Sequence, residues 1–331
     1  TIDLRTGEIR EHRQEDLITL ITDVVFDSSA ECPTWIAFLN LVLDGDDELI
    51  RYVRQLLGYA LIGTNDAHIL PIAWGGGCNG KSTLCSVMIQ ILGEYATTAM
   101  ESLALGTKNE HSCEVADLYG RRFVAINEPE SGDRLRESRV KMLTGDSQIV
   151  ARGMRENPWT FDRTFLLWMS TNHKPRISGT DEAIWRRIKV VPFVIDIRTK
   201  TEPIPDYDRW LVEHEGSGIL NWLIAGCLDY QANGFIEPEC VKLAVDEYRH
   251  EEDQLGAFID ECCITGQDGY HETADKLFDA YQQWAGKEAI TKTLFGREMA
   301  KRFRKDRPRA GSLRNKTTYY GVTLAGDDVA Q

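Results

Sequence analysis

The chain of 331 residues exceeds the size that one hydrophobic core usually supports, so two or three domains are expected. Its 42% hydrophobic and 27% charged residues are typical of a globular protein, and no apolar run reaches the roughly 18 residues that a membrane span needs. The net charge of −14 argues at first sight against nucleic acid, but residues 1–70 hold 5 basic and 13 acidic residues whereas residues 297–316 hold 9 basic and 2 acidic. A local basic face can still hold a phosphate backbone, so the overall sign decides little.

The cysteines and the first residue bear on the setting of the protein. Eight cysteines are scattered, with no Cys-x-x-Cys pair and no His pair at zinc spacing, which indicates reduced thiols. We therefore expect a cytoplasmic location, where thiols stay reduced. The chain begins with Thr1 rather than Met and has no leader pattern, so we interpret it as a fragment that lacks a preceding domain.

The first part of the chain changes from helical to alternating patterns. Residues 1–66 begin with a turn and then carry apolar residues at helical spacing, such as Trp35, Phe38 and Leu39. Short apolar runs separated by helical stretches follow at 69–74, 122–126, 164–169 and 188–194. Strands that alternate with helices predict an α/β domain with a largely parallel sheet.

The last part of the chain is mainly helical. Helical patterns at 207–232 and 239–264 precede two further helices, 273–286 and 293–305, and two short strands near 312–324. This final order is typical of a winged helix-turn-helix domain. We therefore expect a helical, collar-like region at 1–66, an α/β core at 67–198, a helical connection at 199–264 and a winged helix at 265–331.

A phosphate-binding motif opens the α/β core. Residues 75–82, Gly-Gly-Gly-Cys-Asn-Gly-Lys-Ser, fit G-x-x-x-x-G-K-[ST] between an apolar run and an amphipathic helix. Glycine N–H groups can converge on phosphate oxygens there, and the helix N-terminus adds its positive dipole end. Lys81 is expected at the β- and γ-phosphates of ATP, Ser82 at Mg²⁺ and Thr83 at the α-phosphate, although a turn without a ligand is the alternative. The expected nucleotide-binding residues are Gly75, Gly77, Asn79, Gly80, Lys81, Ser82 and Thr83.

Two later strands end in polar groups that suit hydrolysis. The run 122–126 leads to Asn127-Glu128, and we expect Glu128 to activate the attacking water, unless it is an exposed Glu after an ordinary buried strand. Asn127 stands where many such ATPases have Asp. The expected metal ligands are Ser82, Asn127 and Glu128. The run 164–169 leads to Asn172, whose amide can sense the γ-phosphate.

These motifs, in this order, resemble those of the superfamily 3 helicases. The most similar members are the primase-helicases of phages, plasmids and poxviruses. The matching stretches are Gly-Gly-Cys-Asn-Gly-Lys-Ser (76–82), Asn-Glu-Pro-Glu (127–130), Leu-Thr-Gly-Asp (143–146), Ser-Thr-Asn-His-Lys-Pro-Arg-Ile (170–177) and Gly-Thr-Asp-Glu-Ala-Ile-Trp-Arg-Arg (179–187). The resemblance implies a P-loop, AAA+-like core in a hexameric ring with ATP between neighbours, 3′ to 5′ movement, and a primase or polymerase domain before Thr1.

The resemblance also assigns roles that composition cannot. One of Arg186 and Arg187, with Arg187 favoured, would be an arginine finger at the γ-phosphate of the adjoining subunit, and a structural salt bridge is the alternative. A hairpin at 147–163, with its turn at Asn157-Pro158, would enter the ring channel and grip a single DNA strand. The expected DNA-binding cations of this region are Arg152, Arg155, Arg163 and Lys141. The family's usual doubled glycine is single here, at Gly145, and the shorter turn could re-aim the hairpin.

A basic helix is expected near the end of the chain. Phe295, Met299 and Phe303 recur every fourth residue, so they would form one face of a helix over 295–305. The expected DNA-binding cations of the remaining faces are Lys301, Arg302, Arg304 and Lys305. A wing with Arg314, Lys316, Tyr319 and Tyr320 would follow it and suit duplex or fork DNA. A solvated charged face is the alternative.

Three functions remain open from the sequence. The leading hypothesis is an ATP-driven DNA helicase of a virus-like replicon, which acts in the cytoplasm of a host cell. The second is a DNA-binding initiator or scaffold that nucleotide only switches, which the uncharged Asn127 favours. The third is a small-molecule kinase, for which no lid or acceptor pattern is present.

Overall fold

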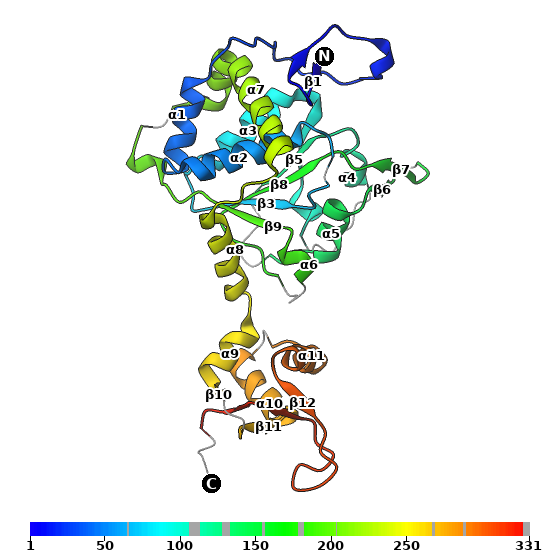
Figure 1. Ribbon diagram of the computed structural model, residues 1–331, viewed down its shortest axis with the longest axis vertical. Coiled ribbons are helices and arrows are strands. Elements are labelled where there is room, and N and C mark those ends of the chain that lie inside the picture. Colours follow the sequence, from blue (N-terminus) through cyan, green and yellow to red (C-terminus); the bar gives the residue numbers. More distant parts are fainter. Residues whose placement is uncertain are drawn as a thin grey trace. The chain divides into compact units, whose positions relative to one another are not determined.

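The computed structural model describes residues 1–64, 66–105, 113–127, 133–153, 156–177, 182–202, 204–266, 269–286 and 289–326. The chain forms two compact units, Thr1–Tyr248 and Arg249–Gln331 (Figure 1). Our finer division into four regions stays a prediction. Among the described residues, no helix combines the length and the apolar character that a membrane crossing requires.

A five-stranded parallel sheet forms the centre of the first unit, in the order β4-β5-β8-β3-β9. Its strands are β3 (Leu70–Trp74), β4 (Ala96–Ala99), β5 (Phe123–Asn127), β8 (Leu166–Thr171) and β9 (Ile188–Pro192). The predicted α/β class with a parallel sheet is confirmed, and four of the strands coincide with the predicted apolar runs. The edge strand β4 was missed because Ala-Thr-Thr-Ala is not an apolar run.

Helices cover both faces of this sheet (Figure 1). One face packs on α1 (Pro33–Val42), α2 (Asp47–Ala60), α3 (Lys81–Leu92) and α7 (Tyr207–Asn233). The other packs on α4 (Cys113–Ala116), α5 (Glu137–Gly145), α6 (Glu182–Trp185) and α8 (Glu239–Glu251). In β8, Leu166 and Trp168 belong to the first core, and Leu167 and Met169 belong to the second. Both faces of the inner strands β3, β5 and β8 are buried, and that is why these strands have continuous apolar sequences.

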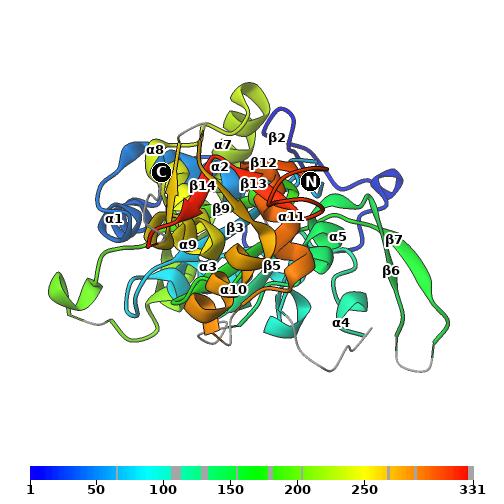
Figure 2. The ribbon, with the colours of Figure 1, turned by 90° about the horizontal axis from the view of Figure 1, so that it is seen from below.

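The predicted hairpin of 147–163 is present. Strands β6 (Gln148–Ala151) and β7 (Trp159–Asp162) pair antiparallel, from Gln148↔Asp162 to Ala151↔Trp159. Alternate residues face the second core, since Ile149 and Phe161 are buried whereas Val150 is 66% exposed. The hairpin projects from the body of its unit (Figure 2).

Short elements complete the first unit. They are β1 (Ile2–Asp3), β2 (Glu8–Ile9), η1 (Gln14–Asp16), η2 (Gly93–Tyr95), η3 (Glu101–Leu103) and η4 (Ile197–Thr199). Helix α1 is bonded to α7 through the buried Glu215. The Glu215 carboxylate accepts hydrogen bonds from the N–H groups of Thr34 at 2.9 Å and Trp35 at 2.8 Å. This carboxylate satisfies backbone donors in the first turn of α1 that no residue of that helix could satisfy.

The second unit combines three helices with short antiparallel strands. The helices are α9 (Gln254–Cys262), α10 (Ala274–Ala285) and α11 (Lys292–Arg302). The strands are β10 (Cys263–Thr265), β11 (His271–Thr273), β12 (Arg304–Asp306), β13 (Thr318–Tyr320) and β14 (Val322–Leu324). They form the sheets β11-β13-β12 and β10-β14 around a core with Phe258, Tyr281 and Phe295.

Two sequence predictions for the end of the chain are wrong in detail. The helix expected over 239–264 is two helices, because Asp253 accepts from the Gly256 N–H at 2.9 Å and starts α9 anew. The helix expected to reach residue 305 ends at Arg302, and Arg304–Asp306 pairs with β13 instead. Strand pairing with a segment more than ten residues away outweighs the local helical spacing of Phe303.

Candidate functional site

Three polar chain segments meet at one edge of the parallel sheet. Strand β8 lies between β5 and β3, with Asn127 opposite Ser170 and Trp74 opposite Thr171. The carboxyl ends of parallel strands share one edge, so the glycine loop after β3, Asn127 after β5 and Asn172 after β8 converge there. The convergence predicted for these segments is therefore present among the described residues.

The glycine loop has the shape that its motif predicts. It leaves β3 at Gly75, passes through Gly80 with a φ of +85°, and enters α3 at Lys81. A Cβ atom on Gly75 would lie 1.9 Å from the carbonyl oxygen of Phe193, so only glycine allows this close approach to the segment after β9. The buried Asn79 donates to the same oxygen at 2.8 Å and holds the loop in place.

Lys81 links the glycine loop to the end of β8. Its Nζ donates to the Gly75 carbonyl at 2.7 Å, to Oδ1 of Asn79 at 2.8 Å and to Oδ1 of Asn172 at 3.0 Å. Only 5% of Lys81 is exposed, and a buried ammonium is tolerated only where acceptors surround it. The predicted pair of phosphate-binding lysine and sensor amide thus lies within hydrogen-bond distance.

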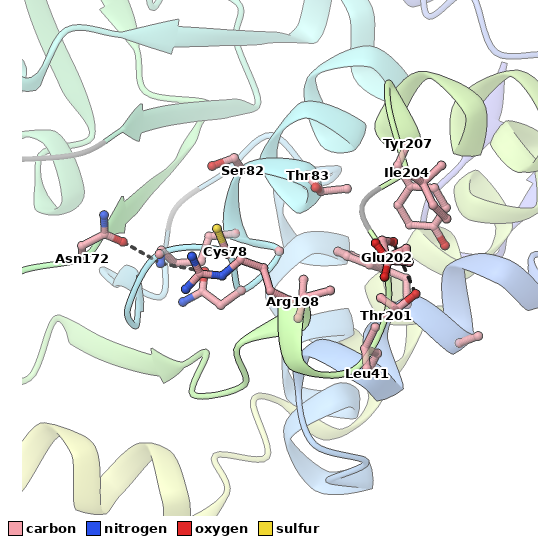
Figure 3. Close-up of a pocket in the computed structure, with 17 residues that line it drawn as sticks. Leu41, Cys78, Ser82, Thr83, Asn172, Arg198, Thr201, Glu202, Ile204 and Tyr207 are labelled. Carbon is pink, nitrogen blue, oxygen red and sulfur yellow. Dashed lines mark hydrogen bonds between the residues drawn. The ribbon is translucent and has the colours of Figure 1, made fainter.

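A cavity of about 580 Å³ opens in front of the loop, which is within the usual range for small-ligand sites. Residues 77–83 and Asn172 form its polar wall, and Ser82 and Thr83 line it from the first turn of α3. Figure 3 places Asn172 on one side of the loop and the apolar residues Ile204 and Tyr207 on the other. A polar end beside an apolar end suits a ligand that carries phosphates on one side and a flat ring on the other.

The wall of the cavity that faces the polar wall was largely missed by the sequence predictions. It comes from α1 and from the chain between β9 and α7: Phe38, Leu41, Ile197, Arg198, Thr201, Glu202, Ile204 and Tyr207. No short motif marks these residues, since they lie far from the glycine loop in sequence. Arg198 is held at the rim by Asp196, with contacts of 3.0 and 2.6 Å, and this pairing lowers the pKa of the Asp196 carboxyl.

Two of the three predicted metal ligands lie among the described residues. The Ser82 hydroxyl and the Asn127 amide are both exposed, at the start of α3 and the end of β5. Glu128, predicted as metal ligand and as base for the water, lies outside the described residues. Among the described residues, no cluster of three His, Cys, Asp or Glu side chains suits a metal ion, so oxygen groups beside the loop remain the fitting donors.

The two candidate finger arginines have different surroundings. The guanidinium of Arg187 donates to the Ala183 carbonyl at 2.6 Å and to Oγ1 of Thr144 at 3.2 Å. The Arg186 side chain is exposed, and it makes no hydrogen bond or ion pair with any described residue. Neither lines the cavity of its own chain. Arg187, the residue favoured from sequence, therefore forms hydrogen bonds within its own subunit. The exposed Arg186 side chain could contact the nucleotide of a neighbouring subunit.

The predicted DNA-binding cations of the first unit also divide. Arg152 is exposed at the hairpin and donates from Nε to the Glu156 carbonyl at 2.9 Å, and Arg155 lies outside the described residues. Lys141 pairs with Glu137 at 3.8 Å. Arg163 is only 7% exposed, its Nε donates to the Asp146 carbonyl at 2.7 Å, and burial lowers its pKa. The DNA contact predicted for Arg163 is therefore withdrawn, because this guanidinium is buried at the base of the hairpin.

A matched pair of glycine substitutions tests the loop geometry. Gly75→Ala is expected to lower Tm by about 5 °C and to weaken nucleotide binding, because the added methyl group must displace the Phe193 carbonyl. Gly76→Ala is the control, since a Cβ atom there meets nothing within 4 Å, and its Tm should stay within about 1 °C. Thermal unfolding followed by circular dichroism measures both. Equal Tm values for the two variants would contradict the close approach at Gly75.

Parts of the chain match known families and viral proteins. Residues 73–187 match the model of a family of unknown function, DUF5906, and residues 1–44 match a family described as D5 N terminal like. A protein of Acanthamoeba polyphaga mimivirus named "Putative helicase L207/L206" is 27% identical over 278 residues, and "Putative helicase 022R" of Frog virus 3 is 22% identical over 258. A protein of African swine fever virus named as "Putative primase" is 25% identical over 146 residues. The chain is thus similar to viral proteins named as helicases and primases, which is consistent with the resemblance to primase-helicases that its motifs indicate.

Solved structures share the fold of this chain. The C-terminal region of NrS-1 (305–718) in its apo form matches with a TM-score of 0.54 over 90% of this chain and 77% of that one, at 13% identity. A second apo form of that region matches with a TM-score of 0.57. The two viral proteins named as helicases are much longer than this chain: the alignments cover 78% and 72% of this chain but only 29% and 26% of theirs.

Proposed function

We propose that this chain is the ATP-driven motor of a DNA helicase that unwinds DNA during replication as a ring of subunits, expected to be a hexamer. The observation that carries the proposal is the contact of Lys81 with Asn172 in front of the cavity, at 3.0 Å. It joins the residue that would bind the β- and γ-phosphates to the residue that would sense the γ-phosphate. The names of the viral relatives support the same assignment.

The cavity supports a division of roles for ATP. The loop N–H groups and Lys81 would hold the phosphates, with Thr83 at the α-phosphate, and the base would pack against Phe38 and Tyr207. Ser82, Asn127 and Glu128 would hold Mg²⁺, which supplies positive charge to the phosphate oxygens. Glu128 would orient or deprotonate the attacking water.

Hydrolysis would need a second subunit. Arg186 is exposed and has no partner among the described residues of its own chain, so it is the better candidate to reach the γ-phosphate of a neighbour. Arg187 would hold the end of α5 in place instead, through Thr144. This assignment replaces the preference for Arg187 that the sequence alone suggested.

DNA would pass through the ring channel along the hairpin of β6 and β7. Arg152 is exposed there, and Arg155 follows it three positions later in the sequence. We further propose that the second unit is a winged-helix domain, that a longer protein adds a primase or polymerase domain, and that it works in the cytoplasm of a host cell. The name "Putative primase" of one viral relative and the greater lengths of the relatives support the additional domain.

Strand displacement on a forked DNA tests the proposal. With ATP and Mg²⁺ the chain should release the displaced strand, whereas ADP or a non-hydrolysable ATP analogue should give no release, because unwinding requires turnover. A parallel mass measurement in solution should give a ring. Ring formation and DNA binding without strand release would favour the second candidate function, a nucleotide-switched initiator. The uncharged Asn127 at the end of β5, where many such ATPases have Asp, supports this second candidate.

A further inference from the structure

Strand β12 and the connection that follows it, residues 304–316 and together named the β12–β13 loop, carry most of the unpaired positive charge in the described part of the second unit. Residues 304–316 hold six basic residues and one acidic residue, within a chain of net charge −14. All six are exposed: Arg304, Lys305, Arg307, Arg309, Arg314 and Lys316. Figure 1 shows this loop, in red, extending beyond the helices of its unit. A concentrated cationic surface on an acidic protein indicates a polyanionic partner.

Four of the five described cations of α10 and α11 pair with nearby acids, whereas the exposed Arg297 of α11 has no acidic partner among the described residues. Lys301 of α11 pairs with Glu298 at 3.0 Å, and Arg302 pairs through both oxygens of Asp253, at 2.6 and 2.7 Å. A cation that is already paired gains less from a phosphate, because the existing contact must first be broken. Lys301 and Arg302, which the sequence predicted as DNA contacts, are therefore poorly placed for that task.

The loop cations are presented differently. Lys305, Arg309, Arg314 and Lys316 make no ion pair with any residue that the structure describes. Arg304 stacks on Tyr320 with 5.2 Å from Cζ to the ring centroid, which leaves its guanidinium edge open.

The loop backbone is nevertheless formed. The Asn315 N–H donates to the Pro308 carbonyl at 2.8 Å, and Nε of Arg307 donates to the Asn315 carbonyl at 2.8 Å. A further turn joins the Arg314 N–H to the Gly311 carbonyl at 3.1 Å. Cations on an ordered loop lose less entropy on binding than cations on an unstructured segment.

We propose that the β12–β13 loop, and not α11, is the duplex DNA contact of this unit, through phosphate oxygens. The composition of the loop favours a duplex over a single strand, because residues 304–316 include no aromatic side chain on which unpaired bases could stack. The residues between its cations, Ala310-Gly311-Ser312, have small side chains that would let the backbone approach DNA closely. The contact needs neither ATP nor the ring, and it thus goes beyond the proposed motor.

Two triple variants of the full chain test the proposal without nucleotide. The loop variant is Arg309→Ala/Arg314→Ala/Lys316→Ala, and the matched helix variant is Lys292→Ala/Arg297→Ala/Lys301→Ala, which removes three cations of α11, among them the exposed Arg297. Fluorescence anisotropy with a labelled duplex at several salt concentrations should give at least about tenfold weaker binding for the loop variant. Its slope of log K against log salt should fall by about 2 to 3, as three lost phosphate contacts require.

The outcomes separate the alternatives. The helix variant should bind the duplex within about threefold of the original chain, and a larger loss for it than for the loop variant would overturn the assignment to the loop. An equal loss of single-strand affinity in the loop variant would overturn the assignment to duplex DNA. All loop substitutions are at exposed positions, so an unchanged Tm is expected and would exclude misfolding as the cause. ATP hydrolysis without DNA should be unchanged, which keeps this test independent of the motor proposal.

Discussion

Lys81→Ala is expected to lower kcat/KM for ATP hydrolysis by about 100-fold or more. The Lys81 ammonium group donates hydrogen bonds of 2.7 to 3.0 Å both to the glycine loop, at Gly75 and Asn79, and to Asn172. Without it, the γ-phosphate loses charge stabilisation in the transition state, and Asn172 loses the group that fixes its amide. A coupled ADP-release assay at saturating Mg²⁺ measures the effect.

An exposed lysine provides the control for this experiment. Lys242→Ala removes a lysine of α8 that pairs only on the surface, with Glu239 at 3.4 Å, and it should hydrolyse ATP at the original rate. Circular dichroism should give folded protein for both variants. Hydrolysis by folded Lys81→Ala at more than about a tenth of the original rate would contradict the assignment of the loop as the catalytic nucleotide site.

The second large effect is expected from Arg186, not from Arg187. Arg186→Ala should reduce kcat about 1000-fold, as loss of an arginine finger does, while Tm stays unchanged because this exposed side chain has no partner in its own chain among the described residues. Arg187→Ala should lower the free energy of unfolding by about 2 kcal/mol, since the bonds to Ala183 and Thr144 are lost. Parallel ATPase and thermal unfolding measurements separate the two residues. A stable, inactive Arg187→Ala together with an active Arg186→Ala would reverse the assignment.

Mixing two inactive variants tests whether the site is shared. Arg186→Ala subunits keep the glycine loop and Lys81→Ala subunits keep the finger, so about a quarter of the interfaces in a randomly mixed ring would be complete. The mixture should therefore recover ATP hydrolysis that neither variant has alone. No recovery in mixed rings of the right mass would place Arg186 at the nucleotide of its own chain.

The sequence by itself determined the features that local patterns specify. The glycine loop could be predicted from the sequence because phosphate binding needs glycines, Lys81 and Ser82 at fixed spacing between a strand and a helix. The inner strands β3, β5 and β8 could be predicted because burial on both faces makes them apolar, and the edge strand β9 could be predicted because it is mostly apolar, whereas the other edge strand, β4, could not. Motif order was also sufficient to indicate the primase-helicase family and the hairpin of β6 and β7.

The tertiary structure decided what depends on partners distant in sequence. The apolar wall of the cavity joins Phe38 to Tyr207, and no short pattern links these residues. Arg186 is preferred over Arg187 as the finger because Arg187 donates a hydrogen bond to Thr144 of its own chain. The β12–β13 loop is preferred over α11 because Arg302 of α11 pairs with Asp253, and because Arg304–Asp306 pairs with β13 instead of continuing the helix. Adjacent cations look alike in a sequence, because only folding determines which of them meets an acid or a carbonyl and which of them stays free for a phosphate.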